Sequence, residues 1–283
     1  MKRPLQPVTE GYFSMKNQFL LIIAFFQISF TSFGQTESPY KTKFKVDGPI
    51  TLGGVAASGL GLYLISNKSG LSPEEVSGLG KNSVNKFDRF SAGNYDEDAK
   101  KLSNIPLYSS FVLPLALLLD KKVVGSAPQV FLLYGETMAI TGTLYAMTAG
   151  IVYRKRPLVY GDKAPFAKRT TKNANNSFFA GHTAATASAT FFAAKVFNDF
   201  NPDSPWRPVV WGAAAAIPAS VGYLRLKAGK HFLSDNLIGY AVGSTVGILV
   251  PHLHKKSNTS GFSVVPNYDQ IEGNGFAVTY SFK

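Results

Sequence analysis

Apolar residues along the chain gather into long segments that polar, basic stretches separate. These segments lie at 50–65, 105–119, 130–152, 183–197, 209–224 and 236–253. None shows the strict alternation of apolar and polar positions that is typical of a half-buried strand. The pattern therefore predicts an all-α protein, in which about six apolar helices form a bundle.

The composition of the segments favours a bundle embedded in a membrane. Segment 130–152 is long enough to span a bilayer and contains a single acid, Glu136. Gly, Ala, Ser and Thr are frequent, which suits close packing between membrane helices. Other segments are short or partly polar, so the buried helical core of a soluble protein is the alternative. An acid within a membrane is a functional candidate by default, but we assign Glu136 no catalytic role.

The N-terminal region resembles an export signal that begins at Met15. Lys16 provides the positive charge, an apolar run follows from Phe19 to Phe30, and small and polar residues come next. We predict a signal peptide with an N-terminal extension at 1–35, cleaved near Gly34 or Gln35, with an uncleaved signal anchor as the alternative.

The remaining chain divides into a helical domain at 36–255 and a tail at 256–283. Between the first two apolar segments lies a polar connector, residues 66–104, which we expect at the membrane surface. In the tail, 261–265 and 276–282 alternate weakly in polarity around a turn at 272–275. This pattern predicts a short C-terminal β-hairpin.

The charge balance narrows the possible partners. The chain carries 29 Lys and Arg against 17 Asp and Glu, a net charge of +12. Such a surplus favours anionic partners, namely phosphate esters or anionic lipid. Nucleic acid is not expected, because no basic helix or aromatic-rich sheet motif occurs. The absence of cysteine excludes disulfides, thiolate metal sites and a cysteine nucleophile. Nothing in the sequence indicates the oligomeric state.

Three short pieces, far apart in sequence, combine arginine with histidine. They are Arg154-Lys155-Arg156-Pro157, Ser177-Phe178-Phe179-Ala180-Gly181-His182, and a third in which Arg225 precedes His231 and Asp235. Transfer of a phosphoryl group requires cations on its oxygens, a nucleophile and a proton donor for the leaving oxygen. The pieces contain all three kinds of group.

Each candidate residue has a chemical role in such a site. Arg156 and Arg225, with Arg154 nearby, can hold phosphate oxygens in their planar forks. The imidazole of His231 can attack phosphorus, and Asp235, one helical turn later, would orient that ring if the stretch is helical. His182 then serves as general acid and base.

The residues around His182 predict an anion site at a helix start. Free backbone N–H groups at that end, with Ala180 and Gly181 leading into it, would bind phosphate, and Gly181 would allow close approach. No Asp/Glu cluster or His-x-x-His spacing is apparent, so we expect no metal and no cofactor. His252 and His254 lie at an interfacial helix end and are not expected to be catalytic.

The ordered pieces resemble the type 2 phosphatidic acid phosphatase and vanadium haloperoxidase superfamily, in its bacterial membrane-associated phosphatase branch. The signature of that family is Lys-x6-Arg-Pro, Pro-Ser-Gly-His and Ser-Arg-x5-His-x3-Asp, which this chain resembles over 149–235. The resemblance implies that Arg156 and Arg225 bind phosphate, His182 is the acid and base, and His231 is the nucleophile paired with Asp235.

The chain departs from the signature at several positions. The first Lys falls at Ala149, the Pro-Ser pair at Phe179-Ala180, and the third-motif Ser at Leu224. Arg154 or Lys155 could replace the missing cation, and backbone N–H groups remain at Ala180. Losing one well-used donor typically costs about 3–4 kcal/mol in catalysis.

These observations predict a metal-independent histidine phosphatase that acts on phosphate mono- or diphosphate esters. The expected substrate is a lipid phosphate, such as phosphatidate, prenyl diphosphate, phosphatidylglycerol phosphate or lipid A, in the bacterial cell envelope. The alternatives are a soluble periplasmic acid phosphatase for small phosphomonoesters, and a non-catalytic protein that binds phosphate or lipid, given Ala149 and Ala180. Haloperoxidase chemistry would require vanadate in the phosphate site, and such enzymes are usually larger.

The membrane topology contains a conflict. A cleaved signal places residue 36 outside, and spans at 50–65, 105–119 and 130–152 would then bring Arg156 to the cytoplasmic side. The usual arrangement of the family places the site outward. We expect a site that faces the periplasm, with one early segment not spanning or the domain not embedded.

Overall fold

The computed structural model describes residues 38–256, 262–269 and 273–280 of the chain. The predicted signal peptide and N-terminal extension lie outside the described residues. Within them the fold is a helical bundle, as expected. Its α-helices are α2 Phe44–Ser66, α3 Pro73–Ser77, α4 Glu97–Phe111, α5 Leu113–Leu117, α6 Lys121–Val124, α7 Ala127–Ile151, α8 Phe166–Arg169, α9 Gly181–Phe200, α10 Arg207–Lys227 and α11 Leu233–Leu253. Short 3-10 turns lie at Lys81–Ser83, Arg89–Ser91, Pro157–Tyr160 and Lys172–Asn175.

The helix count differs from the six that the sequence predicts. The described residues contain ten α-helices, five of which have 20 residues or more. Segment 105–119 shows the physical reason. Its helix α4 begins earlier, at Glu97, because the Asp96 side chain accepts the Ala99 N–H at 2.8 Å and caps the first turn. The helix ends before Leu113-Pro114, where α5 starts separately.

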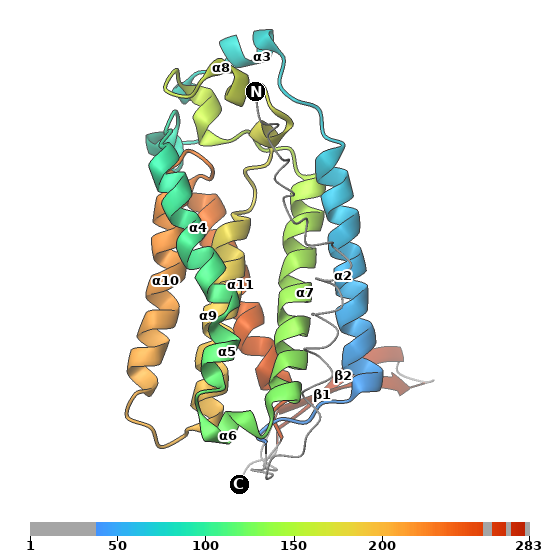
Figure 1. Ribbon diagram of the computed structural model, residues 1–283. Coiled ribbons are helices and arrows are strands. Elements are labelled where there is room, and N and C mark those ends of the chain that lie inside the picture. Colours follow the sequence, from blue (N-terminus) through green and yellow to red (C-terminus); the bar gives the residue numbers. More distant parts are fainter. Residues whose placement is uncertain (1–37, 257–261, 270–272, 281–283) are drawn as a thin grey trace, which may run out of the picture.

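The long helices run side by side along the bundle axis (Figure 1). Helix α9 contacts α7, α10, α11 and α4, while α2 packs on the outer side of α7. Side chains of α7, α9 and α11 form the main core, which includes Leu133, Phe192 and Val246. At the end where α2 finishes, residues 66–96 and 152–176 cover the bundle with short turns around Leu71, Val76 and Leu158.

Two antiparallel strands follow the bundle in sequence. Strand β1, Phe262–Asp269, pairs with β2, Gly273–Tyr280, from Phe262 opposite Tyr280 to Asp269 opposite Gly273. Their bounds differ from the predicted segments, and part of the predicted turn lies outside the described residues.

Among the described residues, three helices are long and apolar enough to cross a membrane, namely α2, α10 and α11. Helix α7, the clearest candidate from the sequence, is not one of them, and it is enclosed between α2 and α9. The outer faces carry large apolar side chains, among them Leu52 at 71 % exposure. Apolar side chains directed outward over a whole bundle are expected where the solvent is lipid.

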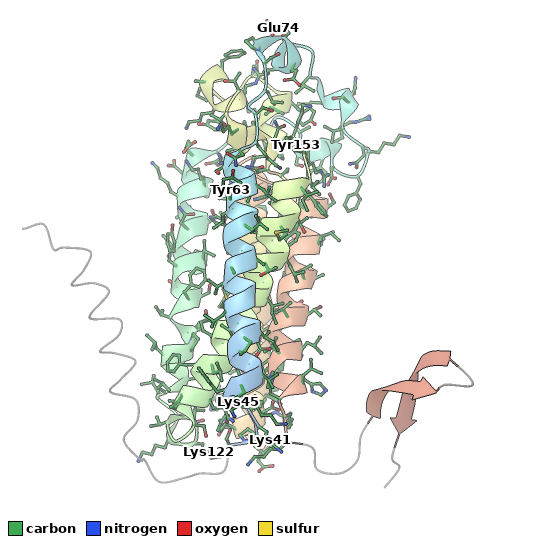
Figure 2. The ribbon with its side chains drawn as sticks, turned by 90° about the vertical axis from the view of Figure 1, so that its right-hand side faces the viewer. Lys41, Lys45, Tyr63, Glu74, Lys122 and Tyr153 are labelled. Carbon is green, nitrogen blue, oxygen red and sulfur yellow. The ribbon has the colours of Figure 1, made fainter. Side chains whose placement is uncertain are left out.

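The two ends of the bundle carry polar and amphipathic side chains (Figure 2). Lys41, Lys45 and Lys122 lie at the end where α2 begins. Tyr63 and Tyr153 lie toward the opposite end, and both are exposed. Lysine and tyrosine at these levels are typical of the two interfaces of a membrane. The bundle thus has the features of a membrane protein.

A row of glycines brings α11 against the backbone of α9. Gly239, Gly243 and Gly247 recur every fourth residue and therefore lie on one helix face. A Cβ atom on Gly239 would lie 2.6 Å from the carbonyl oxygen of Ala180, and one on Gly247 would lie 2.5 Å from that of Ser188. A Cβ atom on Gly243 would overlap the Ala184 carbonyl in the same way. Small residues permit this close backbone contact.

We expect Gly243→Ala to lower the stability of the bundle. The added methyl must displace the Ala184 backbone, and overpacking of this kind costs ~1–3 kcal/mol. The control is Gly212→Ala on α10, where a Cβ atom meets nothing within 4 Å, so stability should be unchanged or slightly raised. Thermal unfolding of both variants in detergent measures the difference. Equal unfolding midpoints would show that the contact between α9 and α11 is not limiting.

Candidate active site

The three predicted pieces meet at the covered end of the bundle. Arg156 lies just beyond α7, His182 is in the first turn of α9, and Arg225 is in the last turn of α10. His231 lies in the short connection between α10 and α11. Because α9 and α11 begin where α7 and α10 end (Figure 1), residues far apart in sequence come together here.

The imidazole of His231 is buried and held in one tautomer. Its Nδ1 lies 2.6 Å from the backbone oxygen of Ser177, and a carbonyl can only accept, so Nδ1 carries the proton. Burial, together with the charges of Arg225 and Arg156, holds the pKa of His231 well below its usual value. The ring is therefore neutral, with an unprotonated Nε2 available as a nucleophile.

Asp235 does not contact His231 in the way that the sequence predicts. Its carboxylate accepts from the Ser177 hydroxyl at 2.6 Å and from the Phe232 N–H at 2.8 Å. The prediction assumed a helix through both residues, but α11 begins only at Leu233, so His231 lies outside it. Asp235 instead caps the start of α11 and fixes Ser177, whose carbonyl oxygen holds the imidazole.

Arg154 also has a different position from the one expected. Its guanidinium pairs with the Asp235 carboxylate, and with Asp88 at 2.7 Å. Asp88 comes from the polar connector and also accepts the backbone N–H of Ser234 at 3.0 Å. Arg154 therefore ties the connector to the start of α11, and its charge is already balanced by two carboxylates.

Three other cations that lie close to His231 are buried without such balance. Arg156 and Arg225 are each 5 % exposed and Lys230 is 9 % exposed. Within the described part of the chain none of them forms an ion pair, and the Nε of Arg225 has no hydrogen-bond partner. Burial lowers the pKa of Arg156 to about 10. Uncompensated buried cations are costly, so the arrangement fits a site that receives an anion.

Lys230 is a residue of this cluster that sequence reasoning missed. Burial lowers the pKa of its ammonium group to about 8, and the charges of Arg156, Lys100 and Arg225 contribute to the shift. In the sequence, its position directly before His231 is the feature that could have indicated a place in this cluster. By contrast, Ala149, where the family has its lysine, is fully buried in α7.

The start of α9 differs in part from the predicted anion site. The Ala180 N–H donates to the backbone oxygen of Asp235 at 3.1 Å, so it is not free to bind phosphate. A Cβ atom on Gly181 would lie 2.5 Å from the ring of Tyr145, so this glycine is required for close packing. The N–H groups of the next residues remain at the positive end of the helix dipole.

His182 is positioned by α4, which sequence reasoning did not connect with the site. Its Nε2 lies 3.2 Å from the Asn104 Oδ1, and the neighbouring Ser103 hydroxyl lies 3.5 Å from the Arg225 Nη1. Such contacts depend on the packing of α4 against α9 and α10. Residues that the structure adds to the site are Asp88, Ser103, Asn104, Ser177, Lys230 and Ser234.

Comparison with known proteins agrees with the geometry. Residues 130–259 match the PAP2 superfamily. The family resemblance predicted from the three pieces is confirmed over this range, which contains all of them. No curated protein matches the chain significantly.

The chain is also similar to a solved structure. It is the crystal structure of the first transmembrane PAP2 type phosphatidylglycerolphosphate phosphatase from Bacillus subtilis, with 18 % identity and a TM-score of 0.39. The alignment covers 83 % of this chain and 94 % of that one.

We expect binding of a tetrahedral oxyanion to weaken as the pH rises through about 8. Lys230 has a pKa of about 8, so its charge is present below this pH and lost above it. A charge-assisted contact of this kind corresponds to about tenfold or more in affinity. Tungstate is a suitable probe because it stays a dianion across the range.

In the same titration Lys230→Arg should keep its affinity above pH 8, since guanidinium remains charged. Lys230→Met should bind weakly at every pH. Identical pH profiles for the wild type and both variants would remove Lys230 from the anion site.

Proposed function

We propose that the protein is a phosphatase that hydrolyses phosphate mono- or diphosphate esters through a phosphohistidine intermediate. The observation that carries this proposal is the neutral, buried His231. Its unprotonated Nε2 lies among cations that have no carboxylate partner in the described part of the chain. A nucleophile that must approach a negatively charged phosphoryl group needs those charges neutralised. The PAP2 match over the same residues supports the assignment.

The reaction follows from the roles of the side chains. Arg156, Arg225 and Lys230 hold the phosphoryl oxygens, and His231 Nε2 attacks phosphorus. Burial and the charges of Arg225 and Arg156 lower the pKa of His182 to about 3, so the ring takes up its proton once the bound phosphoryl group offsets those charges. As the N–P bond forms, the P–O bond to the leaving group breaks, and the protonated His182 donates its proton to the leaving oxygen. His182 then takes a proton from water, whose oxygen attacks phosphorus and releases phosphate and His231.

In this proposal Lys230 replaces the cation that the family signature has at Ala149. Arg154 does not, because Asp88 and Asp235 already balance it. Asp235 and Ser177 act as positioning residues, since they hold the His231 ring through the Ser177 carbonyl. With three cations in place, neutralisation does not call for a metal ion.

A lipid phosphate is the substrate class that the architecture favours. The site lies at one end of a bundle whose outer faces are apolar, and three of the described helices are both long and apolar enough to span a bilayer. A phosphate headgroup at the interface could reach this end while its acyl chains stay in the membrane. The candidates are phosphatidate, prenyl diphosphate, phosphatidylglycerol phosphate and lipid A phosphates.

We expect His231→Ala to abolish phosphate release while the tungstate affinity stays within about tenfold, because the three cations remain. His182→Ala should lower turnover by about 10²–10⁴-fold. His252→Ala, an exposed histidine far from the site, is the control. Phosphate release from a lipid-phosphate panel and a soluble phosphomonoester, with chelator present, measures each effect.

The pattern of release separates the alternatives. Release from the soluble ester alone would favour an acid phosphatase for small substrates. Tungstate binding without release from any ester would favour a non-catalytic binding protein. Turnover retained by His231→Ala would overturn the phosphohistidine mechanism.

We also propose that the site faces the periplasm, as the family arrangement suggests. A reporter that is active only outside the cytoplasm should then work when fused near residue 170, beside the site. It should fail near residue 125, which lies at the opposite end of the bundle (Figure 1). The reverse pattern would place the site in the cytoplasm.

A further inference from the structure

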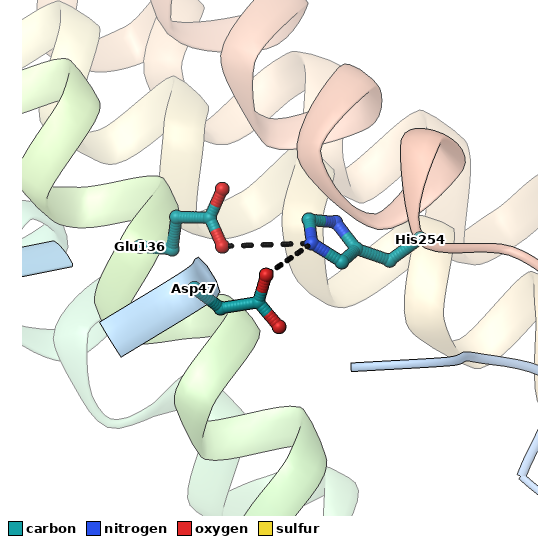
Figure 3. Close-up of side chains that lie close together, drawn as sticks. All are labelled: Asp47, Glu136 and His254. Carbon is teal, nitrogen blue, oxygen red and sulfur yellow. Dashed lines mark hydrogen bonds and ion pairs between the residues drawn. The ribbon is translucent and has the colours of Figure 1, made fainter. Parts of the chain in front are cut away.

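A second cluster of ionisable side chains lies at the end of the bundle remote from His231. Asp47 comes from the first turn of α2, Glu136 from α7, and His254 follows the last turn of α11 (Figure 3). The 21 residues of α11 separate the two sites, which corresponds to about 30 Å along the helix. Nothing in the phosphatase mechanism uses these three residues.

The three side chains direct one ligand atom each toward a common point (Figure 3). His254 Nε2 lies 3.3 Å from Asp47 Oδ1 and 3.7 Å from Glu136 Oε2, and all three atoms lie within 4.8 Å of one another. For metal–ligand bonds of about 2.1 Å, tetrahedral coordination separates ligand atoms by about 3.4 Å. The two spacings from His254 Nε2 are close to that value.

The Glu136 carboxylate provides an independent indication of a ligand. This residue is 4 % exposed, and its Oε2 has no hydrogen-bond partner among the described residues. A buried carboxylate oxygen without a partner is costly. Because that oxygen points to His254 and Asp47, a cation placed between the three groups would satisfy it.

The hydrogen bonds around the cluster leave one ligand atom of His254 and one of Asp47 directed at the common point. His254 Nδ1 lies 2.8 Å from the Val250 carbonyl oxygen, which can only accept a proton. Nε2 is therefore the ring nitrogen that is directed at the two carboxylates. Asp47 uses its other oxygen to accept the Lys43 N–H at 2.6 Å. A ring N–H bonded to a backbone carbonyl is the usual outer contact of a metal-binding histidine.

The net charge of the cluster favours a bound metal ion over a protonated histidine. A divalent cation balances the two carboxylates fully, whereas an imidazolium bridge leaves one negative charge buried among these three side chains. Buried charges are retained when they are paired or bind metals.

We propose that Asp47, Glu136 and His254 form a binding site for a zinc-class divalent ion. One imidazole and two carboxylates suit Zn²⁺, whereas Mg²⁺ and Ca²⁺ prefer more ligands and oxygen alone. The ion joins α2 to α7 and α11, at the place where the Lys41 N–H already donates to the His254 carbonyl oxygen at 2.7 Å. Its role is to hold α2 on the bundle, and it takes no part in the hydrolysis.

The test measures zinc binding by the full chain, purified in detergent without a histidine tag. After removal of metal with a chelator, the wild type should take up one equivalent of Zn²⁺, detected by elemental analysis, and its thermal unfolding midpoint should rise. Glu136→Gln keeps the size of the side chain but loses the charge, and should bind at least about tenfold more weakly. His254→Ala should behave in the same way.

The matched control is His252→Ala, which removes an exposed histidine two residues before His254. It should bind like the wild type. Cobalt substitution gives a second readout, because a tetrahedral site with nitrogen and oxygen ligands absorbs visible light. Failure of the wild type to bind Zn²⁺, or equal binding by Glu136→Gln, would overturn the proposal and leave an imidazolium bridge as the explanation. Neither result would affect the phosphatase assay.

Discussion

The close contact between α9 and α11 determines the geometry of the proposed phosphate site. Three glycines allow the α11 backbone to rest against carbonyl groups of α9, beginning at Ala180 next to the site. The same approach brings Asp235, at the start of α11, to the Ala180 N–H and to the Ser177 hydroxyl. The backbone oxygen of Ser177, held in place by this contact, accepts the hydrogen bond from His231 Nδ1. The orientation of the proposed nucleophile therefore depends on a packing contact that contains no catalytic residue.

The cationic side chains at the covered end of the bundle fall into two groups, those paired with carboxylates and those without such partners. Arg154 is neutralised by Asp88 and Asp235, so it serves to join the connector to the bundle. Arg156, Arg225 and Lys230 are buried without carboxylate partners among the described residues. Burial of cations that have no carboxylate partner costs free energy. In the folded protein, the packing of the helices offsets this cost. In the proposed site, a bound phosphate would return part of that cost, which would couple ligand affinity to stability.

The sequence was sufficient to predict the helical class, the approximate helices and the convergence of Arg156, His182, Arg225 and His231. These predictions depend on local patterns and on an ordered set of motifs. The sequence was not sufficient to predict the contacts that tertiary packing makes. The predicted contact of Asp235 with His231 was wrong because the start of α11 at Leu233 could not be located from the pattern. Asn104 was missed because it lies outside the three pieces, and Lys230 because the signature leaves the position before His231 unspecified. The group of Asp47, Glu136 and His254 was missed because it spans most of the chain.

Helix α2 is the one long helix between residue 38 and the connector that covers the phosphate site. When a chain crosses a bilayer an odd number of times, the two flanking segments lie in different compartments. If α2 crosses, residue 38 and His231 therefore occupy opposite sides of the membrane. A leader that delivers residue 38 to the periplasm would then leave the site in the cytoplasm, whereas a periplasmic site requires residue 38 to stay inside. The compartment of this short N-terminal segment consequently decides which leaflet can supply the substrate.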